Sequence, residues 1–187
     1  MRTGPAYLLN AIVSAGYGCA DEPGGSGLSA CEGLVPSGAP VDNGAVGDHV
    51  FTVTARDHEG HTATKSARYS VGCAFSGFTE PVDNLPVVNV VKAGQAIPLK
   101  WRLVDAASTP VTNLTAAAAS SRVVACAPNA TTDQVEATVA AGLELLNKGG
   151  GYYQLSWKTA SGFAGSCREL LLDLGEGRPW VAPFRFR

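Results

Sequence analysis

The histidines are the first residues of this chain that could do chemistry, and two of them lie close together. His58, Glu59, Gly60 and His61 approach the zinc-binding pattern HExxH but are one residue too short. In HExxH a helix carries both histidines on one face. The glycine here indicates a turn instead, so the pattern favours solvated turn residues. His49 could add a ligand only if the fold brought it close, and we expect neither a metal nor a cofactor.

Nucleophilic catalysis needs a base beside its serine or cysteine, and the sequence does not offer that combination. No GxSxG nucleophile elbow occurs, and all three histidines lie at or before His61. The carboxylate pairs of glycoside hydrolases are neighbours only in space, so the sequence leaves that chemistry open without pointing to it. We expect a protein that is not an enzyme.

Acidic residues in predicted loops are the remaining candidate metal ligands. Asp21, Glu22, Asp57 and Asp83 could bind calcium at the ends of a sandwich. A dedicated calcium loop supplies oxygen ligands at nearly every second position. None of the four lies in such a run, so we interpret them as turn residues.

Charge and hydropathy exclude two classes of partner. The net charge is −2, and no basic stripe occurs, so we expect no binding of nucleic acid. The longest apolar run, near Leu8 to Ala15, is interrupted by Asn10 and is too short to cross a bilayer. A secretory signal within residues 1–20 is a weaker alternative, because this apolar core is short and broken.

The elements that must position these residues are short strands. In PVVNVVKAGQAIPLKWRL, residues 86–103, two strands flank a turn, and alternate residues of the second strand form an apolar face. That face consists of Ile97, Leu99, Trp101 and Leu103. Pro98 and Lys100 lie on the other face, where proline suits a strand start or an exposed edge. An outward lysine on an edge deters aggregation, although Lys100 could instead contact a ligand.

Similar runs separated by Gly, Pro, Asn and Asp continue along most of the chain, which is typical of an all-β sandwich protein. We predict two tandem Ig-like β-sandwich modules joined by a short proline-containing linker. The first module covers residues 1–72, the linker residues 73–86 and the second module residues 87–187. A capping box at Asp133 and Glu136 leaves open whether residues 133–141 form a helix or a strand.

Five cysteines in a loop-rich β protein suggest disulfides and an oxidising compartment. A bridge between Cys19 and Cys31 would staple a Gly/Ser-rich loop, at ~3 kcal/mol in the chain-entropy model. Cys126 and Cys167 are the natural second pair, at ~4 kcal/mol. Cys73 remains, either as a buried thiol or as a partner for a cysteine of another chain or module.

Residues 11–71 resemble the bacterial Ig-like repeats of secreted multidomain proteins. The resemblance rests on YGCADEPGGSGLSACEG and on GAPVDNGAVGDHVFTVTARDHEGHTATKSARYSV. In that family the two cysteines bracket the loop, and the hairpin after FTVTA closes the sandwich. The usual proline-rich first strand has no counterpart before Arg2, so we expect a chain truncated at its start.

Residues 75–187 resemble the PxKF domain, a C-terminal module of secreted bacterial proteins. The matching stretches are FSGFTEPVDNLPVVNVVKAGQAIPLKW, VACAP, YYQLSWKTASGFAGSCREL and the terminal FRFR. The namesake positions are Pro98, Lys100 and Trp101, where tryptophan replaces the usual phenylalanine.

Together these features predict a monomeric, extracellular or surface-bound structural module that spaces or presents upstream domains of the same polypeptide. The alternative function is binding of cell-wall or extracellular glycans by an accessory module of a hydrolase. Sugars would then stack on exposed aromatic rings, for which Tyr7, Tyr152 and Trp180 are the candidates.

Overall fold

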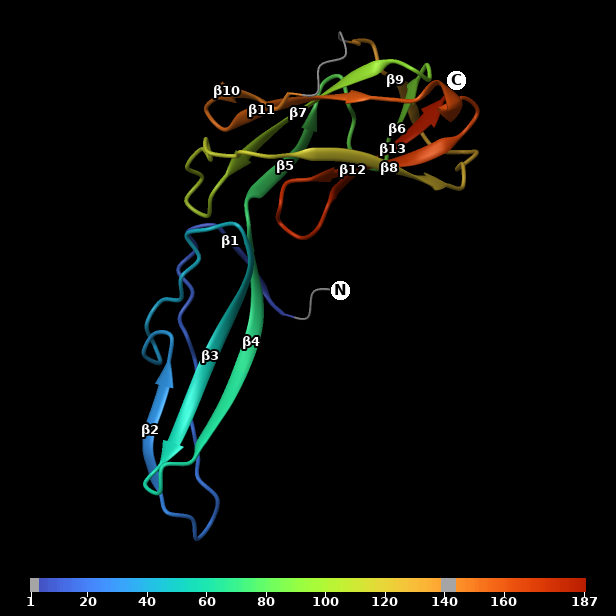
Figure 1. The fold of residues 1–187 in the computed structure, drawn as a ribbon. Coiled ribbons are helices and arrows are strands. Elements are labelled where there is room, and N and C mark those ends of the chain that lie inside the picture. The colour runs from blue at the N-terminus through green and yellow to red at the C-terminus, as the bar shows by residue number, and fades with distance from the viewer. Residues whose placement is uncertain (1–3, 139–143) are drawn as a thin grey trace. The chain divides into compact units, whose positions relative to one another are not determined.

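The computed structural model describes residues 4–138 and 144–187 of an all-β chain (Figure 1). The chain divides into two compact units, Met1–Gly72 (unit 1) and Cys73–Arg187 (unit 2), and the predicted all-β architecture is confirmed in both. The described residues contain one short 3-10 helix, η1 (Ser161–Phe163).

Unit 1 is built around a long hairpin of β3 and β4, which Figure 1 shows as two extended neighbouring strands. The strands of its four-stranded sheet, in the order β1-β4-β3-β2, are β1 (Ala6–Leu8), β2 (Leu28–Gly33), β3 (Gly47–Asp57) and β4 (Thr62–Gly72). β1 runs parallel to β4 and the other pairs are antiparallel. The predicted turn at Asp57 to Gly60 is confirmed, and Gly60 adopts a positive φ of 94° that favours glycine there.

The second layer of unit 1 is short. Residues 13–19, which alternate like a strand, form one antiparallel bridge, between Ser14 and Pro40. Two backbone hydrogen bonds flank it, from Ala15 to Ala39 and from Val41 to Val13, both at 2.8 Å. This layer therefore covers only part of the sheet.

The core of unit 1 is correspondingly small. Its buried apolar residues are Leu9, Ala15 and Val71. Phe51, Val53 and Ala55 alternate along β3 as the residues of an inward face would, but their side chains are only half-buried, and Ala63 and Ala67 of β4 are exposed. The physical reason is the short second layer, which leaves this face of the hairpin largely uncovered.

Unit 2 is a sandwich of two larger sheets. The four-stranded sheet has the order β10-β11-β7-β5 and the five-stranded sheet the order β8-β12-β13-β6-β9. The strands are β5 (Ala74–Thr79), β6 (Val88–Val91), β7 (Ala96–Val104), β8 (Ala118–Val124), β9 (Thr132–Gln134), β10 (Leu146–Gly149), β11 (Tyr152–Lys158), β12 (Cys167–Asp173) and β13 (Trp180–Phe186).

The core of unit 2 contains the apolar face predicted for residues 97–103, which is buried on β7. One face of each of β11, β12 and β13 is buried with it, with Trp180 the half-buried exception. The core residues from these strands include Ile97, Leu99, Trp101, Leu103, Tyr153, Leu155, Trp157, Leu170, Leu172, Ala182, Phe184 and Phe186. Trp157 packs edge-on against Phe184, with 5.2 Å between ring centroids. Such aromatic contacts add to the area that burial removes from water.

The prediction that Pro98 and Lys100 lie on an edge strand was wrong. β7 has β11 on one side and β5 on the other, and Pro98 is buried while Lys100 is half-buried. Pro98 pairs with Ser156 of β11, but pairing with β5 ends at Lys100. Pro98 lies beyond the part of β7 that pairs with β5. Its missing amide hydrogen therefore removes no hydrogen bond between these two strands, which makes proline acceptable inside β7.

One further segment differs from expectation, and another had been left open between helix and strand. Residues 73–86, predicted as the linker, belong to unit 2, because β5 pairs with β7 and Val82 is 2% exposed. At residues 133–141, the strand β9 ends at Gln134 and pairs in parallel with β6. Residues 135–138 have no regular structure, and residues 139–143 lie outside the described part of the chain.

Each unit contains one disulfide, and both predicted pairings are confirmed. Cys19 bonds to Cys31 in unit 1, with 5.8 Å between their Cα atoms. Cys126 bonds to Cys167 in unit 2, with a corresponding separation of 5.2 Å.

Candidate functional site

The turn between β3 and β4 holds the histidine pair that the sequence singled out. One carboxylate oxygen of Asp57 accepts a hydrogen bond from the backbone N–H of His61, and the other lies 2.8 Å from its Nδ1. The His61 side chain holds the pKa of Asp57 at about 2, and Asp57 in turn raises the pKa of His61. The pair is exposed, so it organises the turn and can carry charge, but it encloses no substrate.

These side chains do not form a metal centre. His49 lies at the other end of the hairpin, stacked on Tyr69 at 5.0 Å with its Nε2 2.8 Å from the backbone oxygen of Ala45. Asp21 accepts a hydrogen bond from the Gly27 N–H at 2.7 Å, as a turn residue does. Within residues 4–138 and 144–187, no group of three His, Cys, Asp or Glu side chains is placed to hold a metal ion.

Asp83 belongs to unit 2, whereas Asp21, Glu22 and Asp57 belong to unit 1. Burial raises its pKa, and the neighbouring carboxylate of Asp133 raises it further because two negative charges repel. The Asn89 amide holds this loop by accepting from the Asp83 N–H at 2.8 Å and donating to the Asp83 carbonyl at 3.0 Å. This arrangement fixes a loop, and the carboxylate pair alone does not make a calcium site.

The three aromatic candidates for sugar stacking differ in how exposed their rings are. Tyr7 belongs to unit 1, where its half-buried ring lies 5.9 Å from that of Tyr69. Tyr152 and Trp180 belong to different sheets of unit 2. Only Tyr152, at 49% exposure, presents a largely open ring, and the Arg102 guanidinium lies 5.3 Å from its centroid.

Trp180 is half-buried, and two neighbouring side chains contact its ring. Its ring stacks on Phe75 with 4.4 Å between centroids, and the Arg178 guanidinium lies over it at 4.6 Å. Both neighbours therefore cover part of the indole. The hollow of about 430 Å³ beside it, also lined by Leu85, meets a ring that already packs against two side chains.

Cys73 is the cysteine outside the two disulfides, and its thiol is 3% exposed. Burial raises the pKa of this thiol to about 12, with a further contribution from the Glu176 carboxylate. A thiol with that pKa is almost entirely protonated near neutral pH and reacts slowly. The structure thus favours the buried-thiol interpretation over a bridge to another chain.

Glu176 is the side chain that sequence reasoning missed. It is 2% exposed, and its carboxylate accepts hydrogen bonds from the Cys73 N–H at 2.7 Å and from the Trp180 indole at 3.3 Å. It lies in the glycine-rich loop between β12 and β13, where a charged residue normally indicates solvent. Alternation along the neighbouring strands does not predict that Glu176 is buried. The groups that donate hydrogen bonds to it come from the start of β5 and the start of β13, which are distant from each other in the sequence.

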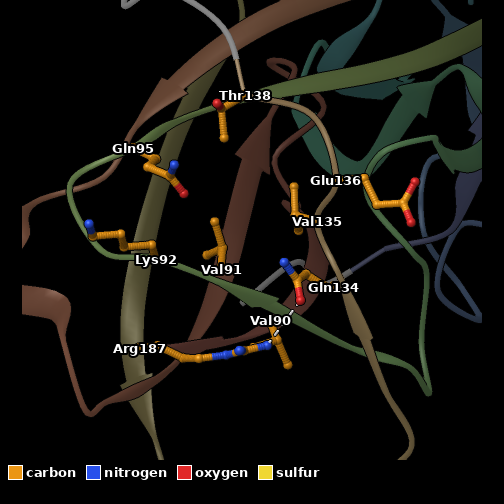
Figure 2. Close-up of a pocket in the computed structure, with 9 residues that line it drawn as sticks. All are labelled: Val90, Val91, Lys92, Gln95, Gln134, Val135, Glu136, Thr138 and Arg187. Carbon is orange, nitrogen blue, oxygen red and sulfur yellow. Dashed lines mark hydrogen bonds between the residues drawn. The ribbon is translucent and has the colours of Figure 1, made fainter.

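A cleft of about 280 Å³ lies where β6, β9 and the end of β13 meet (Figure 2). Polar side chains surround its valines, and Arg187 donates to the Gln134 side-chain oxygen at 3.4 Å. Figure 2 shows Lys92 and Glu136 on opposite sides of the cleft, and both are exposed. Among the residues that line it, no acid and base converge, so the cleft can form hydrogen bonds but shows no arrangement for catalysis.

Comparison with known proteins gives weak similarities. No protein-family model and no curated protein matches the chain. Among solved structures, domains 4 and 5 of the S-layer protein SbsC align over 83% of this chain and 68% of theirs, at 15% identity and a TM-score of 0.32. The chain spans only 21% of the structure of SbsC domains 4–9.

Two other solved structures have similar scores. The fibronectin(III)-like modules of CbhA from Clostridium thermocellum align over 98% of this chain and 88% of theirs, at 12% identity and a TM-score of 0.28. The tandem Ig domains of titin align over 75% of this chain and 62% of theirs, at 12% identity and a TM-score of 0.25. At these scores the alignments carry no argument about function.

Proposed function

We propose that this chain is a non-catalytic, extracellular structural module that spaces or presents upstream domains of the same polypeptide. The observation that carries the proposal is that each compact unit closes its own disulfide between two of its own cysteines. Disulfides persist in oxidising compartments and stabilise small domains there. Among the described residues no helix is long and apolar enough to span a membrane.

The proposal retains the resemblance to bacterial Ig-like repeats in unit 1 and to the PxKF domain in unit 2. In unit 2 the namesake residues Pro98, Lys100 and Trp101 lie on β7, a central strand of its sheet, where Trp101 is fully buried. A buried aromatic at this position supports a packing role for the motif. Lys100, half-buried between two neighbouring strands, supports the same role rather than a ligand contact.

The experiment is calorimetric unfolding of the full chain and of fragments 1–72 and 73–187. A spacer built from self-contained modules should show two transitions in the full chain, each reproduced by one fragment. The three tryptophans, Trp101, Trp157 and Trp180, all belong to unit 2, so tryptophan fluorescence assigns its transition. The proposal would be contradicted if the full chain showed a single transition and neither fragment unfolded cooperatively when tested alone.

A further inference from the structure

The outer edge of β4 in unit 1 is open over most of its length. β3 pairs with one side of β4 from Thr62 to Val71. On the other side β1 pairs only with Ser70–Gly72, and the Pro5 carbonyl accepts from the Ser70 N–H at 3.0 Å. Within the described part of the chain, no backbone group is paired with this side of residues 62–67. A row of free backbone groups is a template for another strand.

A groove of about 460 Å³ runs beside this open edge. Its floor is the face of the hairpin formed by Phe51, Val53 and Ala55 of β3 with Ala63 and Ala67 of β4, and residues 16–20 form its wall. The wall is fixed, because the Tyr17 hydroxyl donates to the Val35 carbonyl and accepts from the Gly33 N–H, both at 2.9 Å.

The opposite face of the hairpin has a different character. There Thr52 lies 3.0 Å from Ser66 and Thr54 lies 3.3 Å from Thr64, oxygen to oxygen, which makes a ladder of hydroxyl groups. An added strand would therefore place alternate side chains against an apolar groove and a polar face. Every second side chain of the added strand must therefore be apolar where it faces the groove.

The charges of β4 specify the occupant further. Lys65 lies on the groove face between Ala63 and Ala67, and Arg68 lies on the other face. Both are exposed, both are positive, and neither has an ion pair among the described residues. Two copies of this chain that paired antiparallel through β4 with Lys65 opposite Lys65 would bring two cations together, which destabilises a sheet. A carboxylate opposite Lys65 would stabilise it.

We propose that the open edge of β4 and its groove form a strand-addition site for an extended segment of a partner protein with the pattern apolar–x–acidic–x–apolar. The acidic residue lies opposite Lys65, and the apolar residues lie opposite Ala63 and Ala67. Main-chain hydrogen bonds supply affinity in such complexes, and alternate side chains supply specificity. The pattern is symmetric, so it holds for parallel and antiparallel addition. This inference concerns unit 1 alone and does not depend on the spacer role.

The test uses the full chain with its disulfides intact and two capped heptapeptides, SVTETVS and SVTKTVS. Titration by amide NMR should shift and protect the amides of residues 62–67 with the acidic peptide. The substitution Lys65→Glu should weaken binding of the acidic peptide about tenfold and strengthen that of the lysine peptide. Lys158→Glu, at an exposed lysine of β11 in unit 2, is the matched control and should change neither affinity.

Four outcomes would overturn the proposal. One is no effect of either peptide on residues 62–67, and another is equal binding of both peptides. The third is a response confined to other residues. The fourth is protection of the same amides that depends on protein concentration without peptide, which would identify a second copy as the occupant. Unchanged amide spectra outside β4 in Lys65→Glu confirm that the variant is folded.

Discussion

Units 1 and 2 are both built of β-strands, but they bury very different numbers of large apolar side chains. Unit 2 encloses the interior of two sheets, and Trp101, Tyr153, Phe184 and Phe186 are all at most 2% exposed. Unit 1 has one four-stranded sheet under a short second layer, and Val71 is its only fully buried large apolar side chain among the described residues. Burial of apolar area is the main favourable term in folding, so the two units must differ in what stabilises them.

The difference shows how a disulfide and a core substitute for each other. In unit 2 the Cys126–Cys167 bond adds to an interior that already excludes water. In unit 1 the Cys19–Cys31 bond closes a loop next to a hairpin whose apolar face is half-open. We therefore expect core substitutions to dominate in unit 2 and the disulfide to dominate in unit 1.

The largest effect is expected from truncation in the core of unit 2. Trp101→Ala should destabilise unit 2 by about 3–5 kcal/mol, because it removes a fully buried aromatic ring and leaves a cavity. Urea unfolding followed by the fluorescence of Trp157 and Trp180 measures it. Phe51→Ala, at a half-buried position, should lower the free energy of unfolding of unit 1 by far less. An equal loss in the two variants would contradict the difference between the two cores.

Removal of the unit 1 disulfide should have the next largest effect. Cys19→Ser with Cys31→Ser should cost unit 1 ~3 kcal/mol in the chain-entropy model, a large share of the stability of a small domain. Backbone NMR spectra of β3 and β4 would report the loss. The fluorescence transition of unit 2 should not move, and a shift of that transition would show that the units do not unfold separately.

Substitution of the buried carboxylate in unit 2 should have an intermediate effect. Glu176→Leu leaves the Cys73 N–H and the Trp180 indole without their acceptor, which costs about 1–3 kcal/mol. Glu176→Gln keeps a side-chain oxygen and should cost less. The same variant pair can be assayed by alkylation, since Cys73 should resist iodoacetamide in the native protein and react faster in Glu176→Leu. Equal stability of both variants would rule out the acceptor role.

The smallest effect concerns the exposed turn of unit 1 and depends on pH. His61 has a raised pKa in the folded state, so its contribution is fully present below pH 6.5 and lost as pH rises through the raised value. Asp57 has a lowered pKa, so its contribution is present above pH 3.8 and lost as pH falls towards about 2. NMR titration of His61 should show a lower pKa in Asp57→Asn. His49→Ala, at the far end of the hairpin, should leave the titration unchanged.

Local patterns in the sequence predicted most of the strands and both disulfides. The alternation from Ile97 to Leu103 indicated the buried face correctly, because side-chain direction in a strand is a local property. The turn at Gly60 likewise follows from residue type. The position of β7 within its sheet was not predictable in this way, since it depends on β5 and β11, which are distant in the chain.

The candidate sites were less predictable than the strands. The histidine pattern was correctly interpreted as a turn, because glycine at position 60 is a local signal. The roles of Glu176 and of the Phe75 and Arg178 contacts with Trp180 were missed, because they depend on which loops the sandwich brings together. The open edge of β4 was missed for a related reason. An alternating strand predicts an inward face, but only the structure shows whether a second layer covers it.

The order of strands in the larger sheet of unit 2 has a consequence for biosynthesis. β13 lies between β12 and β6, so the β8–β12 pair joins the β6–β9 pair only through a strand formed by residues 180–186. The ribosome must therefore release nearly all of unit 2 before that sheet can close, whereas β2, β3 and β4 of unit 1 pair with their neighbours in sequence. Unit 1 can thus fold while unit 2 is still being synthesised or exported. Unit 2 is exposed to proteases until β13 has paired with β12 and β6.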